Sequence, residues 1–183
     1  PPHPAPVLAV AGAVALAEVL DAWGAGPAGV KWPNDVLLDG AKVAGLLGEW
    51  LAGAPPVALL GLGVNVHAAP PAALCPYPTV ALAERLRARG RPVPDRTRLL
   101  AAWLIRLERE LDRSARAGVR ALEDAFLARL RIWAPRGVRE HGPDAPPGGP
   151  LLEFGFETGL AYASGDATIR RPLHALTGLE PKP

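Results

Sequence analysis

Residues 29–50, GVKWPNDVLLDGAKVAGLLGEW, constrain the fold of this chain more than any other stretch. Two runs of mostly aliphatic residues flank the dipeptide Asp39-Gly40. A two-residue type I′ turn needs positive φ at both central positions, and Asp-Gly is a strong short-range signal for it. The stretch therefore predicts two antiparallel strands, at about 30–38 and 42–51, joined by a tight turn.

The predicted turn also sets the register of the two strands. It pairs residue 38 with 41, 37 with 42 and 35 with 44, and side chains that are opposed or two residues apart share a face. Asp35 and Lys42 then become diagonal neighbours, about 7–8 Å apart at the backbone. Because a shift of one residue would move these side chains to opposite faces, their approach depends on this register.

Glycines in the hydrophobic strands indicate a close approach by another group. The segment VALLGLGVNV at 57–66 is a third strand candidate. Glycine weakens a strand unless a ligand or another backbone lies against it. The second and third strands contain four glycines, at positions 45, 48, 61 and 63. We interpret them as a sheet face cleared for a slim or flat ligand, with Lys42 at its edge.

Both polar features of this region have a structural alternative. Asn34 and Asp35 follow Pro33, and an Asn-Asp pair after proline is typical of a turn. An exposed hairpin lysine such as Lys42 protects a sheet edge from pairing with other chains. The ligand interpretation depends on the neighbouring glycines.

The rest of the chain predicts helices and a small β unit. A mostly buried helix is expected at 7–23, and Thr79 and Asp95 are candidate N-caps of two further helices, followed by another at 119–130. Residues 141–150 resemble a linker, and turns at 158–159 and 165–166 indicate short antiparallel strands. We expect an α+β fold with a mixed or antiparallel sheet packed with helices, and domains at 1–132 and 133–183.

Composition excludes several classes of protein. The net charge of +2 provides no basic stripe for nucleic acid, so we expect no nucleic-acid partner. The single cysteine, Cys75, excludes an intrachain disulfide. The apolar run at 5–17 is too short to span a bilayer, so a buried helix and no membrane partner are expected. Because the chain contains no methionine, its first residue is not an initiator.

Three blocks of sequence resemble the catalytic core of biotin protein ligases. They are KWPND at 31–35, KVAGLLGE at 42–49 and GLGVN at 61–65, in the family's order and at similar spacing. The tail, EFGFETGLAYASGDATIRRPLHAL, is similar to the family's SH3-like C-terminal domain. The resemblance implies a biotin/lipoate ligase-like fold and a cytoplasmic enzyme that uses ATP, biotin and Mg²⁺. Such an enzyme forms biotinyl-5′-AMP and biotinylates a lysine of the biotin carboxyl carrier domain of a biotin-dependent carboxylase.

The resemblance also implies roles for particular residues. Lys42 corresponds to the catalytic lysine that contacts the biotin carboxylate and the phosphate. Biotin contacts are assigned to Lys42, Gly45, Leu46, Leu47, Gly61, Gly63 and Val64. The ATP or adenylate site is assigned to Asn34, Asp35, Lys42 and Asn65, with Asp35 also beside the magnesium ion. Trp32 is interpreted as scaffold, and Lys31 receives no role.

The chain departs from the family in one region. The family's Gly-Arg-Gly-Arg-x-Gly loop has no counterpart, so we expect a ligase without its N-terminal portion. A sheet edge left open in this way favours self-association, including a homodimer. Two alternatives follow: a non-catalytic module that binds biotin, its adenylate or a carrier protein, and a protein ligase for lipoate or octanoate.

Overall fold

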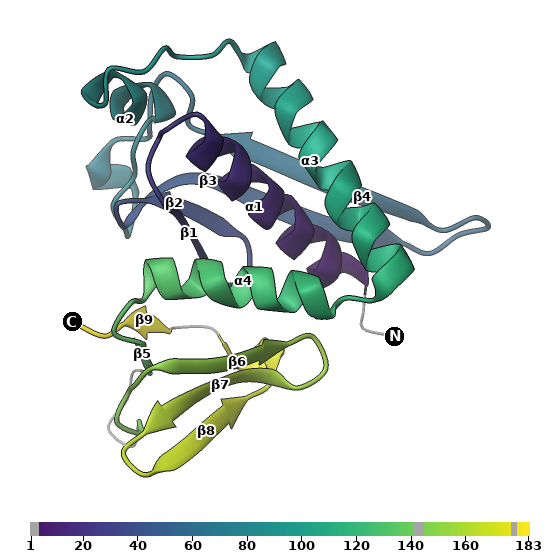
Figure 1. The fold of residues 1–183 in the computed structure, drawn as a ribbon, viewed down its shortest axis with the longest axis vertical. Coiled ribbons are helices and arrows are strands. Elements are labelled where there is room, and N and C mark those ends of the chain that lie inside the picture. The colour runs from purple at the N-terminus through teal and green to yellow at the C-terminus, as the bar shows by residue number, and fades with distance from the viewer. Residues whose placement is uncertain (1–3, 141–144, 177–178) are drawn as a thin grey trace.

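The computed structural model describes residues 4–140, 145–176 and 179–183. Four antiparallel strands form its central sheet, in the order β1-β2-β3-β4 (Figure 1). These strands are β1 (Ala28–Lys31), β2 (Asp35–Leu38), β3 (Ala41–Leu51) and β4 (Val57–Val64). The expected α+β class is confirmed.

Helix α1 (Pro4–Ala22) is the centre of the core. It packs on the strands and against two later helices, α3 (Arg96–Ala117) and α4 (Arg120–Trp133). Val10, Leu16 and Leu20 are completely buried. The segment Ala5–Ala22 is long and apolar enough to cross a membrane, but 61% of it is buried inside the protein. The expectation of a buried core helix is therefore confirmed.

The Asp-Gly hairpin forms as predicted, but the strand before it is broken. Asp39 and Gly40 have φ values of 50° and 78°, as a type I′ turn requires. The expected strand at 30–38 is instead two strands, because residues 32–34 form a turn and Lys31 pairs antiparallel with Asp35. Pro33 has no N–H to donate to a strand ladder, which favours a break at this position.

The two predicted helix caps have different outcomes. The side chain of Asp95 accepts a hydrogen bond of 2.7 Å from the backbone N–H of Arg98, which confirms it as the N-cap of α3. The prediction for Thr79 is wrong. Helix α2 (Leu82–Ala88) begins after Ala81, and the Thr79 hydroxyl donates to the Pro70 carbonyl at 2.9 Å. A short 3₁₀ helix, η1 (Ala72–Leu74), lies in the same loop.

The C-terminal part is a small antiparallel β unit below α4 in Figure 1. Its strands are β5 (Val138–Arg139), β6 (Leu151–Gly155), β7 (Gly159–Ser164), β8 (Ala167–Arg171) and β9 (Glu180–Pro181), with a 3₁₀ helix η2 (Leu173–Ala175). Strands β6, β7 and β8 form one sheet, and β5 pairs with β9. Residues 141–144 of the predicted linker lie outside the described residues. The division at 132/133 stays a prediction.

Candidate functional site

The ammonium group of Lys42 and the carboxylate of Asp35 form the centre of the site. Lys42 Nζ lies 2.5 Å from Asp35 Oδ1, and the two side chains are 24% and 17% exposed. Burial acts to lower the pKa of Lys42, but the hydrogen bond and charge of Asp35, with a contact to Tyr77, outweigh it and raise the pKa above 10.5. Lys42 therefore carries a fixed positive charge at physiological pH.

A β-bulge brings Gly45 onto the face that these two residues share. The pairs 38–41 and 37–42 are confirmed, but the predicted pair 35–44 is wrong. Val36 lies opposite Ala44, and Asp35 lies opposite Gly45, so β3 contains one additional residue at Val43. This extra residue turns Lys42 to the same face as Gly45. A Cβ placed on Gly45 would lie 3.2 Å from Lys42 Nζ and 3.4 Å from Asp35 Oδ1.

Part of the predicted biotin face lies on the same side of the sheet. Gly45 pairs with Gly63 and Leu47 pairs with Gly61, so these residues form one face, which we call the outer face. Leu47 is 60% exposed there. Cβ atoms on Gly61 and Gly63 would have no neighbour closer than 3.8 Å and 3.9 Å, respectively. The outer face is thus open to a molecule from outside.

The remaining members of the predicted face lie on the opposite, helix-facing side. The interpretation of Gly48 as ligand-facing is wrong, because a Cβ there would lie 2.5 Å from the Ala5 carbonyl oxygen of α1. Leu46 is 2% exposed and packs beside Gly12 of α1. Val64 pairs with the buried Ala44. Leu46 and Val64 can therefore contribute to the outer face only through their backbone.

The two predicted asparagines bind backbone groups around the site. The Asn34 amide donates to the Leu46 carbonyl, and the Leu46 N–H donates to the Asn34 carbonyl at 3.0 Å. Asn34 therefore fastens the turn before β2 onto β3. The Asn65 amide donates to the Lys42 carbonyl at 3.4 Å, which places Asn65 directly behind the lysine.

The motif residues Lys31 and Trp32 have structural contacts. Lys31 Nζ lies 5.8 Å from the ring centroid of Trp133, a cation–π contact with α4. The Trp32 ring lies 6.2 Å from Phe126 and 5.7 Å from Phe154. These contacts agree with a scaffold role for Trp32, and they tie the motif to α4 and to the C-terminal strands.

Tyr77 is a site residue that the sequence reasoning missed. Its hydroxyl oxygen lies 3.3 Å from Lys42 Nζ, and its ring centroid lies 5.2 Å from the same atom. Tyr77 belongs to the proline-rich loop between β4 and α2, 35 positions from Lys42. An aromatic residue between Pro76 and Pro78 was the only signal available.

The site offers few side chains that could coordinate a metal ion. Within residues 4–140, 145–176 and 179–183, no group of three or more His, Cys, Asp or Glu side chains has metal-binding geometry. In the described part of the chain, Asp35 is the carboxylate that contacts Lys42. Mg²⁺ commonly binds through one or two carboxylates together with substrate phosphates, so a single aspartate fits such a shared site.

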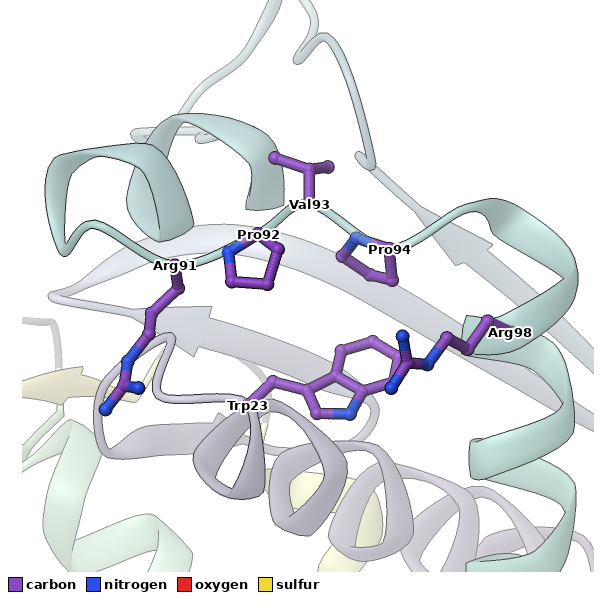
Figure 2. A pocket seen from close by; sticks show the side chains of 6 residues that line it. All are labelled: Trp23, Arg91, Pro92, Val93, Pro94 and Arg98. Carbon is purple, nitrogen blue, oxygen red and sulfur yellow. The ribbon is translucent and has the colours of Figure 1, made fainter.

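A separate cavity lies at the C-terminal end of α1. It has a volume of about 230 Å³ and is lined by Trp23, Arg91, Pro92, Val93, Pro94 and Arg98 (Figure 2). The Trp23 ring lies beneath the loop that carries the two prolines. The cavity shares no residue with the Lys42 site, and it includes none of the residues predicted from the sequence.

Comparison with known proteins finds curated relatives that are named as biotin–[acetyl-CoA-carboxylase] ligases. No family model matches the chain. The biotin–[acetyl-CoA-carboxylase] ligase of Mycobacterium tuberculosis is 36% identical over 115 residues, which are 60% of this chain and 40% of that protein. The enzyme of the same name from Paracoccus denitrificans is 48% identical over 66 residues, 32% of this chain and 28% of that protein. The matched region thus spans less than half of these relatives.

Solved structures share the fold over almost the whole chain. A biotin protein ligase from Aquifex aeolicus has a TM-score of 0.74 at 20% identity, over 97% of this chain and 76% of that one. The same enzyme in complex with biotin and ATP has a TM-score of 0.72 at 20% identity, over 97% of this chain and 72% of that one. The chain is thus similar in sequence to biotin–[acetyl-CoA-carboxylase] ligases over part of its length, and it has the fold of the biotin protein ligase from Aquifex aeolicus over almost all of it.

Proposed function

We propose that this chain contains core catalytic residues of a biotin protein ligase. The proposed reaction joins biotin to AMP and then transfers biotin to a lysine of a biotin carboxyl carrier protein. The observation that carries the proposal is the Lys42 ammonium, which is held over Gly45 at the edge of the open outer face. Support also comes from relatives that are named as biotin ligases and from a structural neighbour in complex with biotin and ATP.

The first step needs a fixed cation because both reactants are anions. A biotin carboxylate oxygen attacks the α-phosphorus of ATP, the new P–O bond forms, and pyrophosphate leaves. Charge accumulates on the phosphoryl oxygens, and a preorganised ammonium stabilises it more strongly in a partly dry site than in water. Removal of one such donor typically costs about 10²–10³ in rate. Arginine would put the charge on a larger planar group, so Lys42→Arg should not restore full activity.

Substrate contacts in this proposal follow from the positions of the site residues around Lys42. Biotin lies on the outer face, against Gly45, Leu47, Gly61 and Gly63. The nucleotide lies toward Asn34, Asp35 and Asn65. Mg²⁺ would be held by Asp35 together with the phosphates of ATP, where it would neutralise phosphate charge.

The proposed partners are a carrier domain and a second copy of this chain. β4 is the last strand of the sheet, and no further strand pairs with it in the described part of the chain. Its unpaired backbone groups favour strand addition and hence self-association. We further propose a cytoplasmic location, as the reaction uses ATP and a carboxylase subunit.

In a second candidate function, the chain binds biotin or its adenylate but does not catalyse adenylate formation. The outer face is exposed at Leu47 and also at Leu59, which is 44% exposed. A ligand bound there would be covered on one side only, and bulk water weakens the electrostatic effect that the reaction needs. This observation favours a module that binds biotin or its adenylate without forming it.

Calorimetric titration with biotin separates the two candidates. A ligase core should bind biotin more tightly when ATP and Mg²⁺ are present and should release pyrophosphate. A binding module should show biotin affinity that ATP does not change, and no pyrophosphate. The absence of biotin binding in both titrations would contradict both candidates, and binding of octanoate or lipoate in its place would identify a different acid substrate.

A further inference from the structure

The loop that carries Tyr77 is tied to the backbone of Lys42. The Lys42 N–H donates to the Pro78 carbonyl at 2.8 Å, and the Val80 N–H donates to the Lys42 carbonyl at 3.0 Å. Residues 42 and 79 thus form a short parallel bridge. Because the backbone of the residue next to Tyr77 is hydrogen-bonded to the backbone of Lys42, the loop places the phenol beside the ammonium.

One of the three N–H donors of the Lys42 ammonium has no acceptor within the described part of the chain. An ammonium group has three N–H donors. Asp35 accepts one at 2.5 Å and the Tyr77 hydroxyl accepts another at 3.3 Å. Among the described residues, Lys42 Nζ has no third hydrogen-bond acceptor. Two fixed acceptors determine the direction of the third N–H, which remains for an incoming ligand.

A phenol suits this role for an electrostatic reason. Asp35 already carries a negative charge, and a second carboxylate would repel the anionic groups that the ammonium has to attract. A neutral hydroxyl orients the ammonium without adding charge. The ring centroid, at 5.2 Å, is also within the range at which an aromatic face attracts a cation.

We propose that Tyr77 is a positioning residue, which together with Asp35 aims the third N–H of Lys42 across the outer face. The contact itself does not depend on the function of the chain. Its consequence for catalysis rests on the proposed function, in which that N–H points to the carboxylate and phosphate of the reactants.

Nuclear magnetic resonance of labelled lysine side chains tests the contact directly. The chain has three lysines, at positions 31, 42 and 182, so each Nζ can be assigned and titrated. Tyr77→Phe keeps the ring and removes the hydroxyl, which raises the pKa of Lys42 in the wild type. We expect the pKa of Lys42 to fall in this variant and the other two lysines to be unchanged.

The other tyrosine provides a matched control. Tyr162→Phe also removes one hydroxyl, but that group bonds to Glu140 in the C-terminal β unit. The proposal is overturned if Tyr77→Phe leaves the pKa of Lys42 at its wild-type value. It is equally overturned if Tyr162→Phe lowers that pKa by the same amount.

Kinetics test the catalytic consequence. A positioning role should appear in kcat for adenylate formation, which we expect to fall by about 3- to 10-fold in Tyr77→Phe with a smaller change in the KM for biotin. An unchanged kcat overturns the catalytic part of the proposal. A wild-type chain without adenylate formation would instead refute the proposed function, and the lysine titration would still decide whether Tyr77 positions Lys42.

Discussion

Lys42 is a residue at which burial and charge act in opposite directions. Burial favours the neutral amine, whereas Asp35 and Tyr77 favour the ammonium, and their combined effect raises its pKa. A lysine with a raised folded-state pKa contributes stability that is fully present below the unfolded pKa. That stability is lost as the pH rises through the folded pKa.

The Asp35–Lys42 pair therefore makes the stability of the protein depend on pH at the alkaline end. Asp35→Asn should lower the free energy of unfolding by about 0.5–1 kcal/mol near neutral pH, as expected for a partly exposed ion pair. The difference from wild type should shrink as the pH rises above 10.5, the ordinary lysine value. Urea unfolding at a series of pH values measures it. A stability difference between wild type and Asp35→Asn that widens above this pH would show that Asp35 does not raise the pKa of Lys42.

Some of this site could be predicted from single residues. The Asp39-Gly40 turn is a local signal, and it correctly placed Lys42 on the strand next to Asp35. Tyr77 could not be predicted, because its contact with Lys42 crosses 35 positions and depends on the fold of a loop. Lys31 was unexplained for the same reason, since its partner Trp133 belongs to α4.

Among the secondary-structure elements, β3 determines which residues share a face. Alternation along a regular strand would place Lys42 with Ala44, Leu46 and Gly48, against α1. The bulge at Val43 instead puts it with Gly45 and Leu47. The sequence carries no glycine or other local signal at this bulge, so pattern reasoning assumed a regular ladder. Gly45 and Gly48 are three residues apart in the regular part of β3, so strand alternation itself puts them on opposite faces, and assigning all four glycines to a single face overlooked this.

Two glycine substitutions distinguish the faces of the sheet. Gly48→Ala should lower the free energy of unfolding by about 1–3 kcal/mol, because the new Cβ meets α1. Gly63→Ala should change stability by less than about 1 kcal/mol. A Cβ at position 63 would lie 3.9 Å from its nearest neighbour, the Gly45 carbonyl oxygen. Under the proposed function, the added methyl group should weaken biotin binding.

Chemical unfolding and biotin titration of both variants measure these effects. Equal loss of stability in the two variants would contradict the assignment of faces. A Gly63→Ala variant with wild-type biotin affinity would contradict biotin binding on the outer face.

In the molecule as a whole, α4 joins the sheet to the C-terminal strands (Figure 1). Phe126 of α4 lies 4.6 Å from Phe154 of β6, between ring centroids, and both rings contact Trp32. Glu123 of α4 accepts a hydrogen bond of 2.8 Å from the backbone N–H of Phe156. The sequence predicted the sheet with its helices and the C-terminal strands. It could not predict the interface between them, because the residues that form it lie far apart in the chain and make no local pattern.

This shared aromatic cluster predicts that the two parts support each other. Phe154 is 1% exposed, and Phe154→Ala should lower the free energy of unfolding by about 3–5 kcal/mol. Ile132→Ala, at a residue of α4 that is 40% exposed, is a control with an expected change of about 0.5 kcal/mol or less. Chemical unfolding followed by the fluorescence of the five tryptophans, which include Trp32 and Trp133 at this interface, measures both. Fluorescence unaffected by Phe154→Ala would show that the C-terminal strands are independent of the sheet.

Release of pyrophosphate from ATP in the presence of biotin is the sharpest test of a catalytic role for Lys42. Wild type, Lys42→Ala and Lys182→Ala are compared, with Lys182 serving as a control because its ammonium contacts the Gly148 carbonyl in the C-terminal part. We expect biotin-dependent release by wild type and Lys182→Ala, and a rate lower by about 10²–10³ in Lys42→Ala. Equal rates in wild type and Lys42→Ala would show that Lys42 has no catalytic role.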